Sequence, residues 1–374
     1  MMILGGIITL LYFILIGSFV YGFDKIKTVK LKDTPSITTF SVVIPFRNEA
    51  NKLPDLLQSI DALNYPNDLF EVIFIDDASE DHSVELIETF FKNSSRSIKI
   101  IPNERRTESP KKDAITSAIN KAKNDWIITT DADCVLPKYW LKSFDEYIQS
   151  SNAVCIAAPV IYGNENTFLN RFQILDILSL QGATIGGFGT NRPFMCNGAN
   201  FAYQKKLFKA LNGFKGNTKI ASGDDIFLLE KMVKTYAKQV HYLKCEHTTV
   251  TTTTEPSWND LVSQRIRWAS KTNAYNNWFG KVTGGIVLLM NGFLFFGVLL
   301  SIIGYFDLKI YIYILIIKFT IDFFLIYKSA FFFKKQDVLK IYPIGFFLYP
   351  LFSTFVALKS LFSGYTWKER SFKS

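Results

Sequence analysis

The chain has 374 residues, of which 48% are hydrophobic and 35 are Phe, so it is long enough for one large domain with accessory segments. Its formal net charge is +9, and much of the positive charge flanks apolar runs, as at Lys25, Lys27 and Lys30. This pattern favours anionic lipid over nucleic acid as a partner. Its four cysteines are scattered without a CxxC pair, which argues against a disulfide framework or a zinc site.

The first segment, residues 2–21, is an almost uncharged run of spanning length. It has no basic stretch before the apolar run and no evident cleavage site, so we predict an uncleaved transmembrane anchor over residues 1–23. Residues 24–39 are polar and are predicted to form a linker. The lysines after the anchor place the central region in the cytoplasm and the N-terminus outside.

Residues 40–254 begin as an alternation of β-branched apolar runs and helical patterns. The predicted strands are residues 40–45, 72–75, 97–101 and 126–130, and the predicted helices between them are 48–63, 81–91 and 110–122. Pro45 is expected to end the first strand. Alternation at this spacing predicts an α/β fold with a mostly parallel sheet flanked by helices and right-handed crossovers.

The second half of the chain is less regular. It is predicted to contain an amphipathic helix at 168–180, a loop at 186–193, a helix at 224–237, extended segments at 240–254 and a helix at 258–270. The last helix is basic and carries Trp, which suits an interfacial position within residues 255–281. Three further apolar stretches predict about three membrane helices within residues 282–363, before a tail at 364–374.

Asp131 and Asp133 follow the strand predicted at 126–130. Two residues apart, their carboxylates lie on the same side of an extended segment. Hard oxygen ligands suit Mg²⁺ or Mn²⁺, with diphosphate oxygens and water filling the remaining positions. Such a metal would neutralise charge on a diphosphate leaving group. A turn with solvated carboxylates is the alternative.

Two further acidic pairs stand at element ends. Asp76 and Asp77 end the second predicted strand, where carboxylates can hold a nucleotide base or ribose; helix capping is the alternative. Asp224 and Asp225 precede an apolar helix, where Ser222 or Asp224 can be the N-cap. A cap explains one acid and leaves the other as a candidate to accept a proton from an attacking hydroxyl.

Cationic residues accompany these acids. Lys111 and Lys112 open a predicted helix, where cations oppose the helix dipole, so a nearby phosphate or simple solvation has to account for them. Arg265 and Arg267, with Trp268, offer guanidinium groups for phosphate and a ring for a sugar or base. Anchoring at the membrane interface needs the same residue types.

The order of these motifs resembles that of membrane-bound family 2 glycosyltransferases with the GT-A fold. The resemblance covers about residues 41–268 and rests on the opening segment 41–49, a GKxxA-like segment with Pro110 for glycine, the DxD, the acidic pair and QxxRW. Residues 197–200 resemble the acceptor-side segment, and residues 367–370 a W-K-G-R element with Glu369 for glycine. The residues that it implies for nucleotide-sugar binding are Pro45, Arg47, Glu49, Asp77, Lys111, Asp131, Gln264, Arg267 and Trp268.

The resemblance implies an inverting, metal-dependent glycosyltransferase that uses a nucleotide sugar, most often a UDP-sugar. Asp225, beside Asp224, would be the catalytic base, Asp133 the ligand of Mg²⁺ or Mn²⁺, and Arg267 a cation that stabilises the leaving diphosphate. The acceptor is expected to be a lipid or another membrane-associated molecule. The protein is expected to be integral to the inner (cytoplasmic) membrane, with its catalytic domain facing the cytoplasm.

Two other functions stay open. A processive polysaccharide synthase also uses QxxRW, but it needs a pore, and only about three spans follow the catalytic region. A non-catalytic membrane nucleotide sensor or scaffold is the alternative from another class, and the intact set of acids argues against it. The sequence specifies neither the sugar, nor the acceptor, nor the oligomeric state.

The basic C-terminus conflicts with four full spans. Four spans would place Lys368, Arg370 and Lys373 outside, against the positive-inside rule. We therefore predict a cytoplasmic C-terminus. Pro343 and Pro350 favour a re-entrant or interfacial hairpin in the last apolar stretch.

Overall fold

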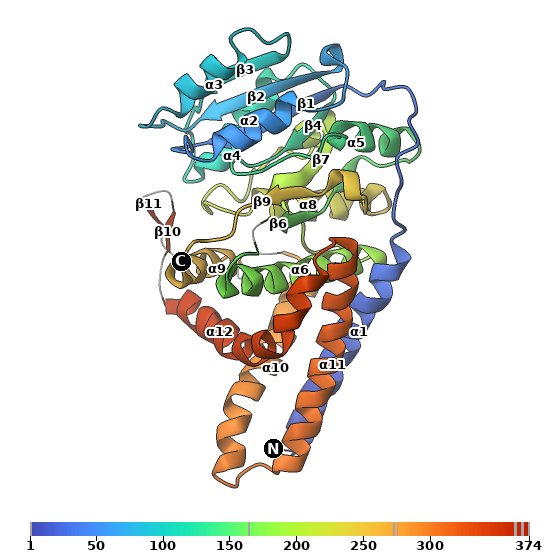
Figure 1. Ribbon diagram of the computed structural model, residues 1–374, viewed down its shortest axis with the longest axis vertical. Helices are drawn as coiled ribbons and strands as arrows, with labels where there is room; N and C mark the ends of the chain where they lie inside the picture. Colours follow the sequence, from blue (N-terminus) through green and yellow to red (C-terminus); the bar gives the residue numbers. More distant parts are fainter. Residues whose placement is uncertain are drawn as a thin grey trace. The chain divides into compact units, whose positions relative to one another are not determined.

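The structure is a computed structural model that describes residues 2–163, 165–271, 274, 276–362, 365–367 and 370–372 (Figure 1). The chain divides into two compact units. Unit 1 comprises Met1–Ile26, Asn164–Phe194 and Thr254–Ser374, and unit 2 comprises Lys27–Gly163 and Met195–Thr253. The segment Asn164–Phe194, expected within the α/β region, therefore belongs to the helical unit.

Unit 2 is built on a seven-stranded sheet with the order β3-β2-β1-β4-β7-β5-β8. Strands β1 to β4 are mutually parallel, β7 is antiparallel to β4 and β5, and β5 is parallel to β8. The expected mostly parallel sheet is thus confirmed. The strands are β1 (Phe40–Phe46), β2 (Phe70–Asp76), β3 (Ser97–Pro102), β4 (Trp126–Thr129), β5 (Cys155–Ala157), β7 (Phe201–Gln204) and β8 (Val240–Tyr242), with β6 (Val160–Tyr162) and β9 (Val250–Thr252) as a separate pair.

The helices of unit 2 follow the alternation that the sequence predicts in its first half. They are α2 (Leu53–Asp61), α3 (Ser83–Phe91), α4 (Pro110–Lys121), α5 (Trp140–Gln149), α7 (Lys205–Ala210) and α8 (Asp224–Tyr236), with single turns η1 (Asn67–Leu69), η2 (Gly198–Asn200), η3 (Ala237–Gln239) and η4 (Glu246–Thr248). Helix α2 begins later than predicted because Asn48 has a φ of 52°, outside the range of a right-handed helix.

Pro45 lies inside β1 and does not end it, contrary to the sequence-based expectation. β1 pairs with β2 along its whole length, whereas its pairing with β4 stops at Val43. The N–H of Asp77 donates to the carbonyl of Phe46, so the nitrogen of Pro45 faces the opposite, β4 side, beyond the last β4 pair. The missing N–H of proline therefore costs no ladder hydrogen bond.

The linker predicted at residues 24–39 is held against α5, a helix that the sequence did not predict. The carboxylate of Glu146 accepts the N–H of Lys32 at 2.7 Å, and Asp145 accepts the N–H of Thr38 at 3.0 Å. Both acids are buried. Because the buried face of α5 includes charged residues, its apolar period is interrupted in the sequence.

Glu71 lies near the start of β2 and stabilises the amino ends of the strands, at the sheet edge opposite to the predicted site. Its fully buried carboxylate accepts hydrogen bonds from Ser41 Oγ, Lys99 Nζ and the N–H of Lys123, each at 2.7 Å. Burial alone would raise the pKa of Glu71, but these three donors outweigh it, and the pKa is lowered. Glu71 therefore contributes stability that is present above its unfolded-state pKa and lost as the pH falls through its folded-state pKa.

We expect Glu71→Gln to lower the free energy of unfolding by about 1.5–3 kcal/mol at neutral pH, because the amide cannot accept from all three donors. The difference between the variant and the wild type should shrink as the pH falls through the lowered pKa of Glu71, because the carboxyl group of the wild type is then protonated. Thermal unfolding of both proteins in detergent across this pH range measures it. A difference that stays constant with pH would contradict the assignment.

Unit 1 is helical. Its elements are α1 (Met2–Lys25), α6 (Phe168–Gly189), α9 (Trp258–Ala269), α10 (Trp278–Ile302), α11 (Leu308–Phe332), η6 (Gln336–Ile341), α12 (Tyr342–Phe362) and the antiparallel strands β10 (Tyr365–Trp367) and β11 (Arg370–Phe372). Four described helices are long and apolar enough to cross a membrane: Met2–Lys25, Trp278–Ile302, Leu308–Phe332 and Gln336–Ser360. They indicate an integral membrane protein, with one N-terminal and three C-terminal apolar helices as expected.

Two expectations for unit 1 need correction. α6 is longer than the helix predicted at 168–180, and it is not amphipathic. It extends into the predicted loop at 186–193 and ends at Gly189, and it is buried on most sides. Its glycines allow close packing on α1, since a Cβ on Gly186 would lie 2.5 Å from the carbonyl oxygen of Phe19. The last apolar stretch is one helix with Pro350 inside, not two helices of a hairpin. Residues Lys368, Glu369 and Lys373 lie outside the described part of the chain.

Candidate active site

Lys111 joins two of the predicted acidic motifs at the carboxyl edge of the sheet in unit 2. Its Nζ lies 2.8 Å from Asp131 Oδ1 and 3.3 Å from Asp224 Oδ2. Asp131 follows β4, Asp224 is the first residue of α8, and Lys111 lies in the first turn of α4. The structure thus places Lys111 beside two acids that are distant from it in the sequence.

The electrostatic surroundings of Lys111 keep it charged. Burial opposes protonation of this side chain, but the carboxylates of Asp131, Asp224 and Asp225 outweigh burial and raise the pKa of Lys111. These acids also explain why a cation stands in the first turn of a helix. Neither of the causes expected from the sequence, a nearby phosphate or solvation, is required.

Lys112, next in the sequence, is a structural residue. Its side chain is buried and its Nζ donates to the carbonyl oxygens of Asn217 at 2.7 Å and Ile220 at 2.8 Å. The ammonium also lies 4.8 Å from the ring centroid of Phe227. Lys112 therefore fixes the segment that leads into α8 and its acids.

The start of α8 excludes capping as the reason for its acidic pair. The N-cap residue is Gly223, with a φ of 84°, and it has no side-chain cap. Neither Ser222 nor Asp224 has the predicted N-cap role. Two carboxylates in the first turn are favourable to the helix dipole and stand beside Lys111.

Gly198 is the backbone partner of the predicted base. Its N–H donates to Asp225 Oδ2 at 3.1 Å, and its carbonyl accepts from Thr129 Oγ1 at 2.6 Å. Asp225 Oδ1 also accepts the N–H of Ile226 at 2.8 Å. The carboxylate of Asp225 is therefore oriented by two backbone donors, and the segment at residues 197–200 positions it.

We expect Gly198→Ala to disturb this arrangement. The added Cβ would lie 2.9 Å from Asp224 Oδ2 and 3.6 Å from Lys111 Nζ, so the Asp224 carboxylate must move. Overpacking of this kind costs about 1–3 kcal/mol, and thermal unfolding should show a lowered Tm. In an Asp224→Ala background the clash is absent and the cost should shrink. The same loss in both backgrounds would contradict this explanation.

Asp133 is the least constrained acid of the cluster. Its side chain is 28% exposed, its Oδ1 lies 3.8 Å from the Cys134 thiol and its Oδ2 lies 3.9 Å from Lys52 Nζ. In the described part of the chain, no three His, Cys, Asp or Glu side chains group closely enough to hold a metal by themselves. Asp131 and Asp133 offer hard carboxylate oxygens of the kind that Mg²⁺ and Mn²⁺ bind.

Asp77 lies at the end of β2 among three donors. Its Oδ1 accepts from Arg105 Nε at 2.6 Å and Asn103 Nδ2 at 2.7 Å, and its carbonyl accepts from Arg47 Nη1 at 2.9 Å. Sequence reasoning missed Arg105 and Asn103. Their signal was a polar and basic segment directly after the third predicted strand, at the same sheet edge.

Three other candidate residues lie in or directly after the first two strands. Asp76 accepts the N–H of Ser79 at 2.9 Å, so it closes the turn after β2 and does not cap α3, which begins at Ser83 and has no side-chain cap. The N–H of Glu49 donates to Ser83 Oγ at 2.9 Å and ties the loop after β1 to α3. Pro45 lies in β1. Their predicted contacts with a nucleotide sugar stay predictions.

The QxxRW residues lie on α9 of unit 1. Arg265, one of the two guanidinium groups considered for phosphate, is buried and donates through Nε to Asp176 of α6 at 2.7 Å. Its guanidinium lies 4.2 Å from the ring centroid of Trp268 and contacts Gln264. Arg267 is half-buried. Within unit 1, this motif therefore joins α9 to α6, and its role in nucleotide-sugar binding stays a prediction.

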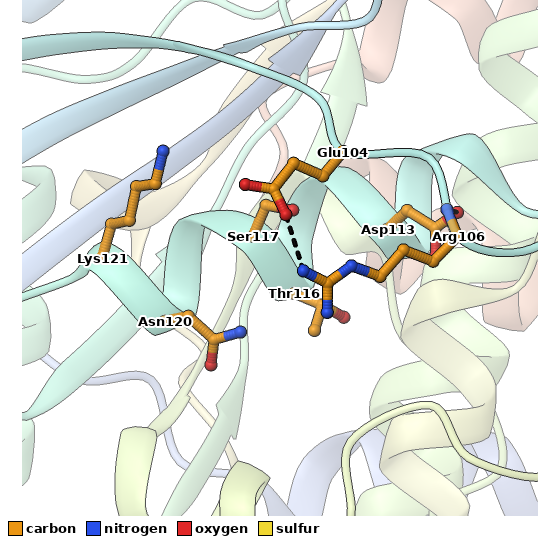
Figure 2. Close-up of a pocket in the computed structure, with 7 residues that line it drawn as sticks. All are labelled: Glu104, Arg106, Asp113, Thr116, Ser117, Asn120 and Lys121. Atoms are coloured by element: carbon orange, nitrogen blue, oxygen red, sulfur yellow. Dashed lines mark hydrogen bonds and ion pairs between the residues drawn. The ribbon is translucent and has the colours of Figure 1, made fainter.

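A separate polar pocket lies on α4 and the segment before it (Figure 2). Its lining consists of Glu104, Arg106, Asp113, Thr116, Ser117, Asn120 and Lys121. Arg106 Nη2 donates to Glu104 Oε2 at 2.6 Å, as the dashed line shows. None of the predicted site residues lines this pocket.

Comparison with known proteins gives consistent results. Residues 41–211 match the family described as Glycosyl transferase family 2. A probable glycosyltransferase, YdaM, of Bacillus subtilis (strain 168) is 25% identical over 244 residues, which are 64% of this chain and 56% of that protein. An undecaprenyl-phosphate 4-deoxy-4-formamido-L-arabinose transferase of Edwardsiella ictaluri (strain 93-146) is 33% identical over 109 residues, 29% of this chain and 33% of that protein. The matches thus span about half and a third of these two relatives.

One solved structure resembles the chain over most of its length. It is the mannosyltransferase PcManGT from Pyrobaculum calidifontis in complex with GDP-Man and Mn²⁺, with a TM-score of 0.58 at 14% identity, covering 96% of this chain and 99% of that one. At this identity the similarity shows a shared fold. The GT-A-type architecture expected from the motifs is confirmed.

Proposed function

Because residues 41–211 match glycosyltransferase family 2, we propose that this chain transfers a sugar from a nucleotide sugar to a membrane-associated or lipid acceptor, with inversion at the anomeric carbon. The observation that carries the proposal is the contact of Lys111 with both Asp131 and Asp224 at the carboxyl edge of the sheet. Ligands of open α/β sheets bind at this edge. The proposed catalytic region is residues 40–254, with the anchor at 1–23 and membrane helices within 282–363.

Asp225 is the proposed general base. It takes the proton of the acceptor hydroxyl, whose oxygen then forms a bond to C1 of the sugar while the bond from C1 to the phosphate oxygen breaks. The N–H groups of Gly198 and Ile226 hold the carboxylate in one orientation before the reaction. Lys111, kept protonated by its acidic neighbours, offsets the negative charge that the cluster and the diphosphate bring together.

Asp133 is the proposed protein ligand of Mg²⁺ or Mn²⁺, and Asp131 is its neighbour in the DxD. The ion, when bound, supplies charge neutralisation for the leaving nucleoside diphosphate. The observation that supports this assignment is the partly exposed and weakly contacted carboxylate of Asp133. The likeness to PcManGT, a structure with GDP-Man and Mn²⁺, agrees with it.

A lipid acceptor is supported by the four apolar helices and by the relative that is named for undecaprenyl-phosphate. We propose the inner (cytoplasmic) membrane as the location, with unit 2 in the cytoplasm, because lysines cluster directly after α1. Asp77, with Arg105 and Asn103, is proposed to receive the base of the donor. A UDP-sugar is the proposed donor class.

The test is turnover of a panel of UDP- and GDP-sugars by the full chain in detergent, with Mn²⁺ and extracted membrane lipids. Release of nucleoside diphosphate that stops on addition of EDTA supports the proposal and identifies the donor. A ladder of products, in place of one, would favour the processive synthase. No turnover of any donor, with or without lipid, would overturn the proposal and favour the sensor or scaffold.

A further inference from the structure

α6 marks one end of the helical bundle in unit 1, because it lies across the C-terminal ends of α1 and α11 (Figure 1). A Cβ on Gly182 would lie 2.9 Å from Leu325 Cγ, close to the end of α11. The end of α1 meets α6 at Gly186, and Asp24 pairs with Lys328 at 2.8 Å. The ends of two membrane helices thus share one level with α6.

α12 remains close to α6, at the same end of the helical bundle, along its length. Just before η6, which leads into α12, Lys335 pairs with Glu165, near the start of α6, at 2.5 Å. A Cβ on Gly345 would lie 3.0 Å from Leu175 Cδ1, and the ring of Phe352 lies 5.4 Å from that of Phe172. A crossing helix would carry residue 352 about 10 Å deeper than residue 345, and away from α6.

The second half of α12 packs on α9. Phe352 and Val356 share one hydrophobic cluster with Leu261 and Ile266 of α9. Figure 1 shows α12 crossing α10, whereas α1, α10 and α11 run in the same general direction. α12 is therefore oriented with α6 and α9 and not with the long bundle helices.

One face of α12 is apolar and exposed. Its residues are Ile344, Phe347, Leu351, Phe355, Leu358 and Phe362, each at least 48% exposed. Their spacing of three and four positions makes one continuous stripe, opposite to the face that packs on α6, α9 and α10. Lys340 and Lys359 stand near the two ends of the stripe and suit anionic headgroups.

We propose that α12 is an interfacial helix whose exposed stripe inserts among the acyl chains of the leaflet that meets α6. Of the four apolar helices described, α1, α10 and α11 then cross the bilayer. This assignment does not depend on the proposed enzymatic function. It is supported by the contact of α12 with α10, because α10 and α11 also carry exposed apolar residues, which include Leu289 and Ile316.

The number of crossings determines the side of the C-terminus. With three crossings, the C-terminus lies on the same side as the linker after α1, and both basic segments of the sequence face one compartment. With four, the C-terminus shares a side with the turn between α10 and α11, near residues 303–307. The two arrangements therefore predict opposite relations between two accessible points of the chain.

The first experiment fuses a side-specific reporter to the full chain after Ser374 or inserts it at Gly304. We expect the two fusions to report opposite sides of the membrane. Reports from the same side would overturn the proposal. The result does not depend on sugar transfer, so it stays informative if the proposed function fails.

The second experiment avoids large fusions. Two variants of the full chain, Ile344→Cys and Phe362→Cys, are each labelled with a nitroxide and placed in vesicles of neutral and anionic lipid. The rates at which oxygen and a nickel chelate collide with the nitroxide give the depth of each label in the bilayer. The native cysteines are buried, and the labelled wild type measures their background. We expect both labels near one interface. A helix that crossed would separate them by about 27 Å and place them in opposite leaflets, which is the contradicting result.

Discussion

Asp225→Asn should lower kcat by about 10²- to 10⁴-fold, the usual contribution of a positioned general base. The amide has nearly the same shape as the carboxylate but cannot accept the proton of the acceptor hydroxyl. It keeps one of the two backbone hydrogen bonds, from Gly198 or Ile226, so a small loss of stability is also expected. Steady-state kinetics with the donor found in the panel measures kcat.

The affinity for the donor separates a base from a binding residue. Calorimetric titration of the nucleotide sugar should give the same Kd for Asp225→Asn as for the wild type. Asp61→Asn is the matched control, because Asp61 is an exposed acid on α2 that pairs with Arg96 at 3.3 Å; its kcat should not change. An Asp225→Asn protein that retains full kcat would remove Asp225 from the mechanism.

Asp133→Ala should abolish metal-dependent transfer while leaving the fold intact. Loss of a metal ligand removes several kcal/mol of transition-state stabilisation, which corresponds to a loss in kcat of at least about 10²-fold. The folded state loses only weak contacts with Cys134 and Lys52, so the Tm should stay close to that of the wild type. Kinetics over a range of Mn²⁺ concentrations and thermal unfolding measure the two effects.

Asp131→Ala is the informative comparison. Asp131 contacts Lys111 at 2.8 Å, and its removal leaves a partly buried ammonium with one fewer carboxylate. We therefore expect a lower Tm for Asp131→Ala than for Asp133→Ala. If Asp133→Ala were fully active with Mn²⁺, or if it unfolded where Asp131→Ala did not, the assignment of the two acids would have to change.

The sheet could be predicted because three of its parallel strands, β1, β2 and β4, are buried on both faces. A continuous apolar run such as the one in β2 is typical of a strand in this environment, and residues that follow such runs have to meet at one edge of the sheet. The positions of Asp77 and Asp131 follow from this rule. The antiparallel half was harder to predict, since β5, β7 and β8 have three or four residues each and lack a periodic signal.

The contacts within the site could not be predicted, because they join residues far apart in the sequence. Lys111 has its partner Asp224 on another element, and nothing local distinguishes it from Lys112, which turns inward and holds a loop. Gly198 has no side chain that would indicate a role in the site, yet its N–H orients the carboxylate of Asp225. The local signal was a lysine in the first turn of a helix, where a cation opposes the helix dipole. The carboxylates of Asp131 and Asp224 explain the position of Lys111.

The acid cluster of unit 2 is proposed to serve sugar transfer to a lipid, and one assay tests this directly. The full chain in detergent is incubated with a radiolabelled nucleotide sugar, a divalent metal and extracted membrane lipid, beside Asp225→Asn. We predict that label enters the organic phase in equal amount to the nucleoside diphosphate released, and that neither product appears with the variant. Equal product from the variant, or diphosphate release without labelled lipid, would contradict the proposed transfer.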